Sequence, residues 1–220
     1  MNALVSCVMP TCDRRDYISA AIACFALQTY KPIELVILDD GNDKVGDLAA
    51  GDPRIRYVSM RDRKSTGEKR NICCDLARGE IICHFDDDDW SSPERVAEQV
   101  ISLKESGKPI AGYSSLLFWD TIHCCAKRYV AQWPGYVCGA TLCYLKSHWQ
   151  AHPFPDKQKG SDNDFIYPSA RLIAASQDES RMVARIHNRH TSAKSNISDS
   201  APIEAIPQGF WENERMRLRQ

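Results

Sequence analysis

Short apolar segments alternate with helical patterns through the first half of the chain, and this alternation constrains the fold more than any other feature. Apolar runs, each long enough for one buried strand, occupy residues 4–9, 33–38, 55–59 and 80–85. Amphipathic patterns typical of helices occupy residues 16–28, 65–79 and 92–107. Ser65 and Ser92 are the expected N-caps of the second and third helices. Strands that alternate with helices of this length predict an α/β fold, with a mostly parallel sheet covered by helices on both faces.

The second half of the chain is less regular. The predicted strands lie at 113–119, 128–133 and 182–186, and the first two could pair antiparallel. Residues 165–175 are predicted to be helical despite Pro168. We expect one domain over residues 1–195, followed by a polar tail, 196–220, that packs loosely or is mobile.

Composition and charge exclude several classes of protein. The 220 residues carry a net charge of −1, which provides no basic surface for nucleic acid. No apolar run approaches the roughly 20 residues that span a bilayer, and the N-terminal strand pattern has no basic leader. We therefore expect neither a transmembrane segment nor a signal peptide. The ten cysteines fall mainly within strand and helix patterns and form no Cys-x-x-Cys motif, which favours reduced core thiols in a cytoplasmic protein.

Polar segments follow three of the predicted strands. Pro-Thr-Cys-Asp-Arg at 10–14 follows the first strand, Asp39-Asp40-Gly41 follows the second, and four consecutive aspartates at 86–89 follow the fourth. The carboxyl ends of parallel strands meet at the edge of an open α/β sheet where ligands bind. Two carboxylates about 4 Å apart repel by roughly 1 kcal/mol in water and about 4 kcal/mol in a partly buried site. The acidic run therefore predicts a cation at this edge, and the alternative is a solvated acidic turn.

Ordered motifs along residues 3–195 resemble those of family-2 glycosyltransferases. The motifs are Val8-Met9-Pro10-Thr11, Gln28-Thr29-Tyr30, Asp39-Asp40-Gly41, Lys69-Arg70-Asn71, Ala77-Arg78-Gly79-Glu80 and Phe85-Asp86-Asp87-Asp88-Asp89. The resemblance implies the GT-A fold, a Rossmann-like, mostly parallel sheet flanked by helices, with a small antiparallel subregion on the acceptor side. It also implies a nucleotide-sugar-binding half at 1–107 and an acceptor-binding half at 108–195. Such enzymes transfer a sugar from a nucleotide diphosphate to a hydroxyl, usually with inversion.

The resemblance assigns donor-binding roles to residues near the strand ends. Pro10 and Thr11 would line the nucleoside pocket, and Asp40 would accept a hydrogen bond from the base. A carboxylate only accepts, so Asp40 suits uracil, thymine or guanine, whose ring nitrogen carries a proton. Arg14 and Arg70 would contact the donor, because a guanidinium holds phosphate oxygens or stacks on a base. A UDP-sugar is the preferred donor.

The acidic run resembles the metal motif of the family. Mn²⁺ and Mg²⁺ prefer oxygen ligands and bridge phosphate oxygens. Asp88 aligns with the direct ligand, and Asp86 with the residue that reaches the ribose and the metal-bound water. Asp87 stands where the family often has a small residue, so the ligand choice stays open and Asp87 counts among the donor-contacting residues. His187 fits the family's late metal-site histidine better than His190 does, and a structural or solvated histidine is the alternative.

An inverting transfer needs a base that removes the proton of the acceptor hydroxyl. The family supplies it from a Glu-Asp pair at a helix start, and the matching residues here are Ser161 and Asp162. Asp162 is the expected base, with Asp164 as its substitute. Alternatively, Asp162 is a helix N-cap. Residues 138–141 resemble the small-residue segment below the acceptor pocket.

Together these features predict a metal-dependent, inverting glycosyltransferase that uses Mn²⁺ or Mg²⁺ and a nucleotide diphosphate sugar. The acceptor would be a saccharide, a lipid-linked molecule or a protein. One alternative is a non-catalytic nucleotide-sugar-binding protein, because Ser161 replaces the family's glutamate. Another is a sugar nucleotidyltransferase, although the chain lacks the Gly-rich basic loop usual after the first strand of that class. The basic and apolar end, 211–219, could contact a membrane-borne acceptor or pack as a helix on its own domain.

Overall fold

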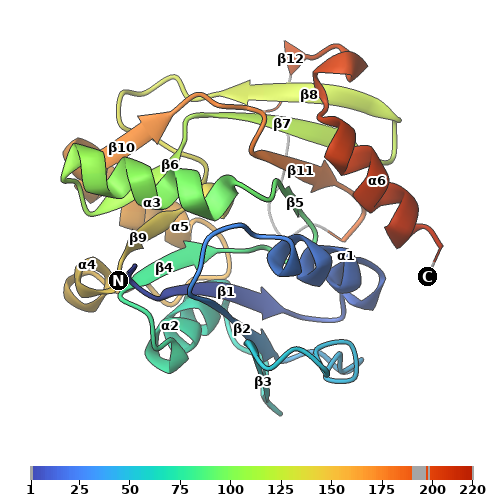
Figure 1. Ribbon diagram of the computed structural model, residues 1–220, viewed down its shortest axis with the longest axis horizontal. Helices are drawn as coiled ribbons and strands as arrows, with labels where there is room; N and C mark the ends of the chain where they lie inside the picture. The colour runs from blue at the N-terminus through green and yellow to red at the C-terminus, as the bar shows by residue number, and fades with distance from the viewer. Residues whose placement is uncertain (1, 190–196, 198, 220) are drawn as a thin grey trace.

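A seven-stranded sheet with helices on both faces forms the core of the structure, a computed structural model that describes residues 2–189, 197 and 199–219 (Figure 1). In order across the sheet, the strands are β10 (Ile173–Ser176), β6 (Ile110–Tyr113), β9 (Cys143–Leu145), β4 (Ile81–His84), β1 (Val5–Thr11), β2 (Ile33–Asp39) and β3 (Ile55–Ser59). Strand β9 runs antiparallel to both of its neighbours, and every other adjacent pair is parallel. The expected mostly parallel α/β sheet is confirmed.

Alternating side chains of the central strands build a core on each face of this sheet, as the two-residue period of a strand requires. On one face, Val5 and Met9 of β1 pack with α1 (Arg15–Ala26) and α3 (Arg95–Ser106). On the other face, Val8 packs with α2 (Thr66–Leu76), α4 (Lys146–Ala151) and α5 (Ser161–Ile166). All ten cysteines are free thiols, and those buried in the core are Cys7, Cys24, Cys73, Cys74, Cys83 and Cys143.

A smaller, mainly antiparallel sheet lies beside the large one. Its strands, in order, are β12 (Asp199–Ser200), β8 (Cys125–Val130), β7 (Ser115–Asp120), β11 (Met182–Ile186) and β5 (Trp90–Ser91). Only the β7–β11 pair is parallel in the described part of this sheet. The chain leaves β4 in the large sheet, passes through the acidic run at 86–89, and enters the small sheet as β5. The acidic run therefore joins the two sheets, and the expected small antiparallel subregion is confirmed.

The prediction of a helix over 165–175 is confirmed only as far as Leu172. Helix α5 ends at Ile166, a 3₁₀ helix covers Tyr167–Leu172, and Ile173 begins β10. Pro168 in the first turn of the 3₁₀ helix has no N–H to donate, and the chain then joins the large sheet by pairing with β6.

One expected helix boundary is confirmed, and the boundaries of two other segments shift. Ser65 caps α2 as predicted, because its hydroxyl accepts the Glu68 N–H at 3.1 Å. Ser92 does not cap α3, which begins at Arg95 with Glu94 at the N-cap position. The predicted strands at 113–119 and 128–133 become β6 and β7, separated at Ser114, and β8 at 125–130.

The C-terminal segment packs more tightly than we expected. Gln208–Arg217 forms helix α6, which lies against α1 and β5 (Figure 1). Phe210 is fully buried, and the Asn213 side chain donates to the Ala20 carbonyl at 2.9 Å. The expectation of a loosely packed tail is therefore wrong for 208–217, where burial of one helix face holds the segment.

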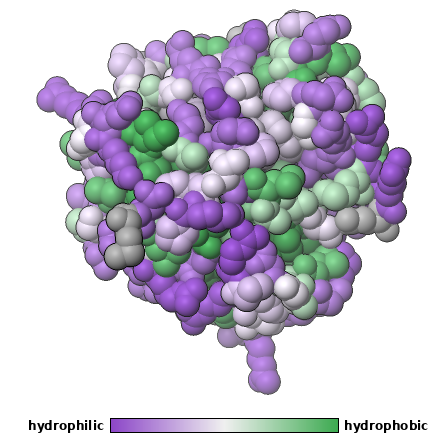
Figure 2. All heavy atoms as spheres, in the orientation of Figure 1, coloured by the Kyte–Doolittle hydropathy of each residue, from purple (hydrophilic) through white to green (hydrophobic). Residues whose placement is uncertain are grey.

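The described residues include no helix with the length and apolar character needed to cross a bilayer. On the face drawn in Figure 2, hydrophobic side chains form small patches among hydrophilic ones.

Replacing Phe210 with alanine tests whether α6 is part of the folded core. We expect Phe210→Ala to lower the free energy of unfolding by about 3–5 kcal/mol, because it removes a fully buried aromatic ring. Chemical denaturation measures this change. The control is Leu218→Ala at the end of the same helix, where the side chain is 69% exposed and the expected change is below about 0.5 kcal/mol. Equal, small effects of both variants would contradict the packing of α6.

Candidate active site

A cavity of about 770 Å³ lies where the polar strand ends of the large sheet meet the small sheet. This volume falls within the range of small-molecule sites, roughly 300–1,000 Å³. The sequence-predicted residues that line it are Pro10, Arg14, Asp40, Arg70, Asp86, Asp87, Asp88 and Asp162. Thr11 and His187 contact this set by hydrogen bonds to Asp87 and Asp88. Segments that are far apart in the sequence therefore converge on one cavity.

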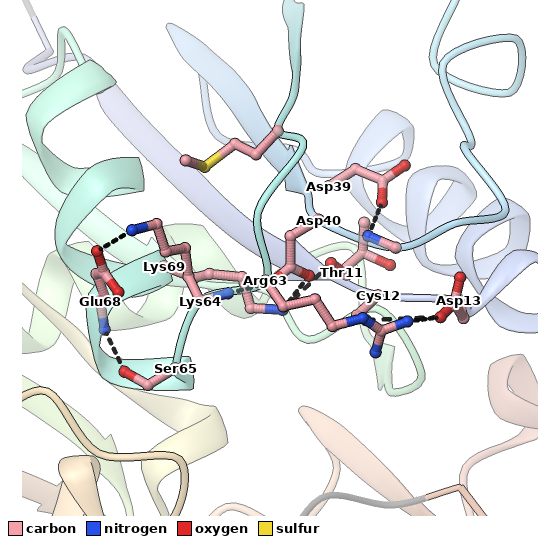
Figure 3. A network of polar contacts seen from close by, with 12 residues as sticks. Thr11, Cys12, Asp13, Asp39, Asp40, Arg63, Lys64, Ser65, Glu68 and Lys69 are labelled. Atoms are coloured by element: carbon pink, nitrogen blue, oxygen red, sulfur yellow. Dashed lines mark hydrogen bonds and ion pairs between the residues drawn. The ribbon is translucent and has the colours of Figure 1, made fainter.

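Asp40 and Lys69 form a buried ion pair at one end of the cavity (Figure 3). Lys69 Nζ donates to Asp40 Oδ1 at 2.8 Å and to the Thr11 carbonyl at 3.3 Å. The Lys64 backbone N–H donates to the other oxygen of Asp40 at 2.8 Å. Burial opposes ionisation of Asp40, but the bonds from Lys69 and Lys64 outweigh it and lower its pKa. Asp40 is thus a charged acceptor facing the cavity.

Asp39, its neighbour, has a different role because adjacent residues of a strand point to opposite faces. The Asp39 carboxylate accepts the Gly41 and Val45 N–H groups and the Tyr57 hydroxyl at 2.8–3.0 Å. A Cβ on Gly41 would lie 2.5 Å from the backbone nitrogen of Asp13, so glycine lets the loops after β1 and β2 touch. Asp39 therefore holds the loop that presents Asp40.

Three of the four aspartates in the acidic run have different partners. Thr11 Oγ1 donates to Asp87 at 2.6 Å. Asp88 Oδ2 accepts from Arg14 Nη1 at 2.5 Å and lies 2.9 Å from His187 Nε2. Asp89 accepts the Arg185 backbone N–H at 3.0 Å, which ties the run to β11. These contacts offset part of the repulsion that is expected between adjacent carboxylates.

The pKa values of Asp87 and Asp88 are shifted in opposite directions. Burial, and then the charges of Asp88 and Asp86, raise the pKa of Asp87 well above its usual value. Burial also opposes the charge on Asp88, but His187 and Arg14 outweigh it and hold the pKa of Asp88 below its usual range. Asp88 is therefore the member of this pair that carries the negative charge most firmly.

Of the predicted metal ligands, Asp88 and His187 are held together at 2.9 Å, and Asp86 also lines the cavity. No group of three or more His, Cys, Asp or Glu side chains with metal-binding geometry occurs among the described residues. Mg²⁺, however, often takes only one or two carboxylates and completes its shell with substrate phosphates and water. His187 is oriented by the Arg189 N–H, which donates to Nδ1 at 3.1 Å, and by stacking on Tyr17 at 4.5 Å. Because Nδ1 accepts this bond, Nε2 carries the ring proton and donates to Asp88, so Nε2 would have to lose that proton to bind a metal. With that proton lost, the donor set fits a partial site that a diphosphate would complete. His190, the alternative histidine, lies outside the described residues.

The two candidate bases lie in different environments. Asp162, in the first turn of α5, lines the cavity, whereas Asp164 is exposed and pairs with Lys157. Gly160 occupies the N-cap position of α5, so Asp162 is not the helix cap. A Cβ on Gly139 would lie only 1.9 Å from Asp162 Oδ2. The Asp162 carboxylate thus rests directly over the backbone of Gly139.

Three buried side chains hold the backbone below Asp162. His84 Nδ1 bonds the Gly139 carbonyl at 3.0 Å, Arg95 bonds the Ala140 carbonyl at 3.1 Å, and Gln99 bonds the Thr141 carbonyl at 2.6 Å. Burial lowers the pKa of His84 well below its usual value, so the ring is neutral and donates from Nδ1. Sequence analysis missed these three residues. The sequence feature that could have indicated them is a polar side chain within an otherwise apolar strand or helix face.

The adjacent residues Lys69 and Arg70 of the Lys69-Arg70-Asn71 motif have different partners. Lys69 is buried and pairs with Asp40. Arg70 instead donates to the Ser161 hydroxyl at 3.2 Å, and its guanidinium lies over the Phe154 ring. Arg70 therefore reaches the start of α5, beside Asp162.

Replacing Lys69 with methionine tests the buried ion pair. We expect Lys69→Met to lower the free energy of unfolding at pH 7 by about 3 kcal/mol, because Asp40 loses its cation in a buried site. The folded-state pKa of Asp40 lies below its unfolded value, near 3.9, so the stabilisation is complete above that value and disappears as the pH falls through the folded-state pKa. The difference between variant and wild type should therefore shrink in acid.

Denaturation at a series of pH values measures this effect. Lys64→Met is the matched control, because it keeps the backbone N–H that Asp40 accepts and removes only a partly exposed pair with Glu68. That surface pair contributes little to stability. A pH-independent difference for Lys69→Met would contradict the assignment.

Comparison with known proteins places the chain in a family. A family model described as glycosyl transferase family 2 matches residues 6–117. The Escherichia coli protein WfgD, a UDP-Glc:alpha-D-GlcNAc-diphosphoundecaprenol beta-1,3-glucosyltransferase, is 34% identical over 107 residues, which are 47% of this chain and 42% of that protein. The matched segments cover less than half the length of the curated relatives.

Solved structures share the fold. Staphylococcus aureus TarS in complex with UDP aligns with a TM-score of 0.69 at 17% identity, over 83% of this chain and 60% of that one. The mannosyltransferase PcManGT from Pyrobaculum calidifontis, in complex with GDP-Man and Mn²⁺, aligns with a TM-score of 0.66 at 15% identity, over 87% of this chain and 59% of that one. The fold is thus the expected GT-A fold, and with its family model matched over half of its length, the chain belongs to glycosyl transferase family 2.

Proposed function

We propose that this glycosyltransferase is metal-dependent and inverting, and that it prefers a UDP-sugar donor. The observation that carries the proposal is the single cavity in which Asp40, Asp88 and Asp162 meet. These residues supply a base acceptor, an anchor for a cation and a general base, which are the parts that such a transfer needs. Residues 1–107 would mainly bind the donor and residues 108–195 mainly the acceptor, with His187 reaching across to the donor side.

The donor base would bind beside Thr11 and the Asp40–Lys69 pair. Uracil and guanine each carry a ring N–H next to a carbonyl, and an acceptor beside a donor matches that pattern. Relatives support a nucleotide donor: TarS was solved with UDP and with UDP-GlcNAc, and PcManGT with GDP-Man and Mn²⁺. Pro10 would line the same pocket, and Arg70 would lie nearer the transferred sugar than the base.

Asp88 and His187 would hold Mn²⁺ or Mg²⁺, with Asp86 as a further candidate ligand or ribose contact. When bound, the ion would neutralise charge on the departing nucleoside diphosphate. Asp87, which is buried and bonded to Thr11, would link the nucleoside loop to the acidic run.

Asp162 would remove the proton from the acceptor hydroxyl as that oxygen attacks the sugar from the side opposite the diphosphate. A single displacement of this kind inverts the anomeric carbon and requires one base on the acceptor side. Asp164 does not line the cavity and is the weaker candidate.

A lipid-linked sugar is the acceptor class we favour. WfgD is named for transfer to a GlcNAc-diphosphoundecaprenol, which supports this class over a free saccharide or a protein. The acceptor side of the cavity includes Tyr129 and Tyr136, whose rings could contact a sugar. Cytoplasmic location remains a prediction.

Replacing Asp88 tests the metal anchor. We expect Asp88→Ala and the isosteric Asp88→Asn to reduce transfer by about 1,000-fold, the loss of several kcal/mol of charge stabilisation in the transition state. Release of UDP from a panel of UDP-sugars in the presence of Mn²⁺ measures the rate, and circular dichroism verifies the fold. Turnover at the wild-type rate by a folded Asp88 variant would rule out this role.

Replacing Asp162 tests the base. We expect Asp162→Asn to lower kcat by about 100- to 10,000-fold while the Kd for UDP, measured by calorimetry, stays unchanged. Asp164→Asn is the matched control and should retain kcat within about twofold, because its carboxylate is exposed. If Asp164→Asn lost activity and Asp162→Asn did not, the two assignments would have to be exchanged.

Adding a methyl group at Gly139 tests the placement of Asp162. Gly139→Ala would push the carboxylate from its position, since the new Cβ would lie 1.9 Å from Oδ2. We expect a loss of kcat comparable to that of Asp162→Asn, with donor binding retained. In the double variant the two losses should not add, because both act through the same carboxylate. Additive losses would show that Gly139 acts elsewhere.

A further inference from the structure

The guanidinium of Arg14 occupies the position between the two candidate metal ligands. Its Nη1 lies 2.5 Å from Asp88 Oδ2 and 3.0 Å from His187 Nε2. Its Nη2 donates to the Arg189 carbonyl, which fixes the plane of the group. The Arg14 side chain is 9% exposed and His187 is 3% exposed, so this contact is shielded from solvent.

A metal ion and this guanidinium cannot both keep these contacts. Asp88 Oδ2 and His187 Nε2 are 2.9 Å apart, and a divalent ion bound to both would lie about 2.1 Å from each. Arg14 Nη1 already lies within 3.0 Å of the same two atoms. The ion would therefore overlap Nη1, or would face it across the ligands as a like charge at short range and low exposure.

We propose that Arg14 competes with a divalent cation for Asp88 and His187, so that the cation must displace the Arg14 guanidinium from these two residues in order to bind. This inference rests on the proposed metal ligands. It adds that the Arg14 guanidinium and the divalent ion exchange with each other beside Asp88 and His187. In the contacts described above, Arg14 already supplies a positive charge beside the acidic run. Because Arg14 also lines the cavity, the displaced side chain has room to turn towards the donor site.

The proposed exchange predicts whether the loss of Arg14 raises or lowers the affinity for the metal. Removal of the charge of Arg14 should strengthen the binding of Mn²⁺ alone, since the ion no longer displaces a cation. If Arg14 instead kept its contacts when the metal bound and only held the ligands in place, its loss would weaken the binding of Mn²⁺.

Titration with Mn²⁺ in the absence of nucleotide, followed by the electron paramagnetic resonance signal of free Mn²⁺, measures this affinity. We expect Arg14→Met to lower the Kd for Mn²⁺ by at least about tenfold, or about 1.4 kcal/mol. Arg15→Met is the matched control: Arg15 is the next residue, pairs with the exposed Asp43 and Asp47, and should leave the Kd within about twofold. Arg14→Met combined with Asp88→Asn should lose the gain, which would locate it at Asp88.

Arg14→Lys provides a second variant in case the methionine variant folds poorly, because it retains the positive charge. Its Kd for Mn²⁺ should stay closer to that of the wild type than to that of Arg14→Met. Unchanged or weaker Mn²⁺ binding by folded Arg14→Met, or an equal gain in Arg14→Lys, would overturn the exchange while leaving the proposed metal site intact. If neither the wild type nor any Arg14 variant binds Mn²⁺ while transfer proceeds in a chelator, both the exchange and the metal dependence are wrong.

Discussion

Compensation of the charge in the acidic run is the constraint on which the rest of the site depends. Four adjacent carboxylates at the end of one strand repel one another, and different elements compensate three of them. Thr11 from β1 bonds Asp87, Arg14 from the loop after β1 contacts Asp88, and the backbone of β11 bonds Asp89. The chemistry of the site and the junction of the two sheets therefore use the same residues.

The C-terminal helix takes part in this support. Arg185, almost fully buried, donates to the Asp88 carbonyl at 2.8 Å and pairs with Glu214 of α6 at 2.8 Å. It also bonds Asn213, which in turn donates to α1. Buried ion pairs add little net stability, but loss of one partner is costly, so they fix geometry more than they add energy. Helix α6 thus helps to set the backbone of the acidic run through Arg185.

The elements that could be predicted are those whose sequence pattern lies within the element itself or directly beside it. Strands β1, β2 and β4 and helix α2 follow from apolar runs, a serine cap and turn residues, all of which lie within a few positions of each other. The second half lacks such signals. Residues 173–176 form β10 because β6 offers an edge to pair with, and α6 forms a tight contact because α1 offers a surface for Phe210. Neither partner is visible in the local sequence.

The sequence by itself determined the α/β class, the family, and which segments would gather at one edge of the sheet, because the ends of the strands follow from the alternation of patterns along the chain. The tertiary structure decided which of several adjacent residues does what: Asp40 over Asp39, Lys69 over Arg70 on the nucleoside side, and Asp162 over Asp164. Such neighbours share the same local pattern. They differ only in the direction of their side chains and in the partners that distant elements bring to them, and both of these are fixed by packing.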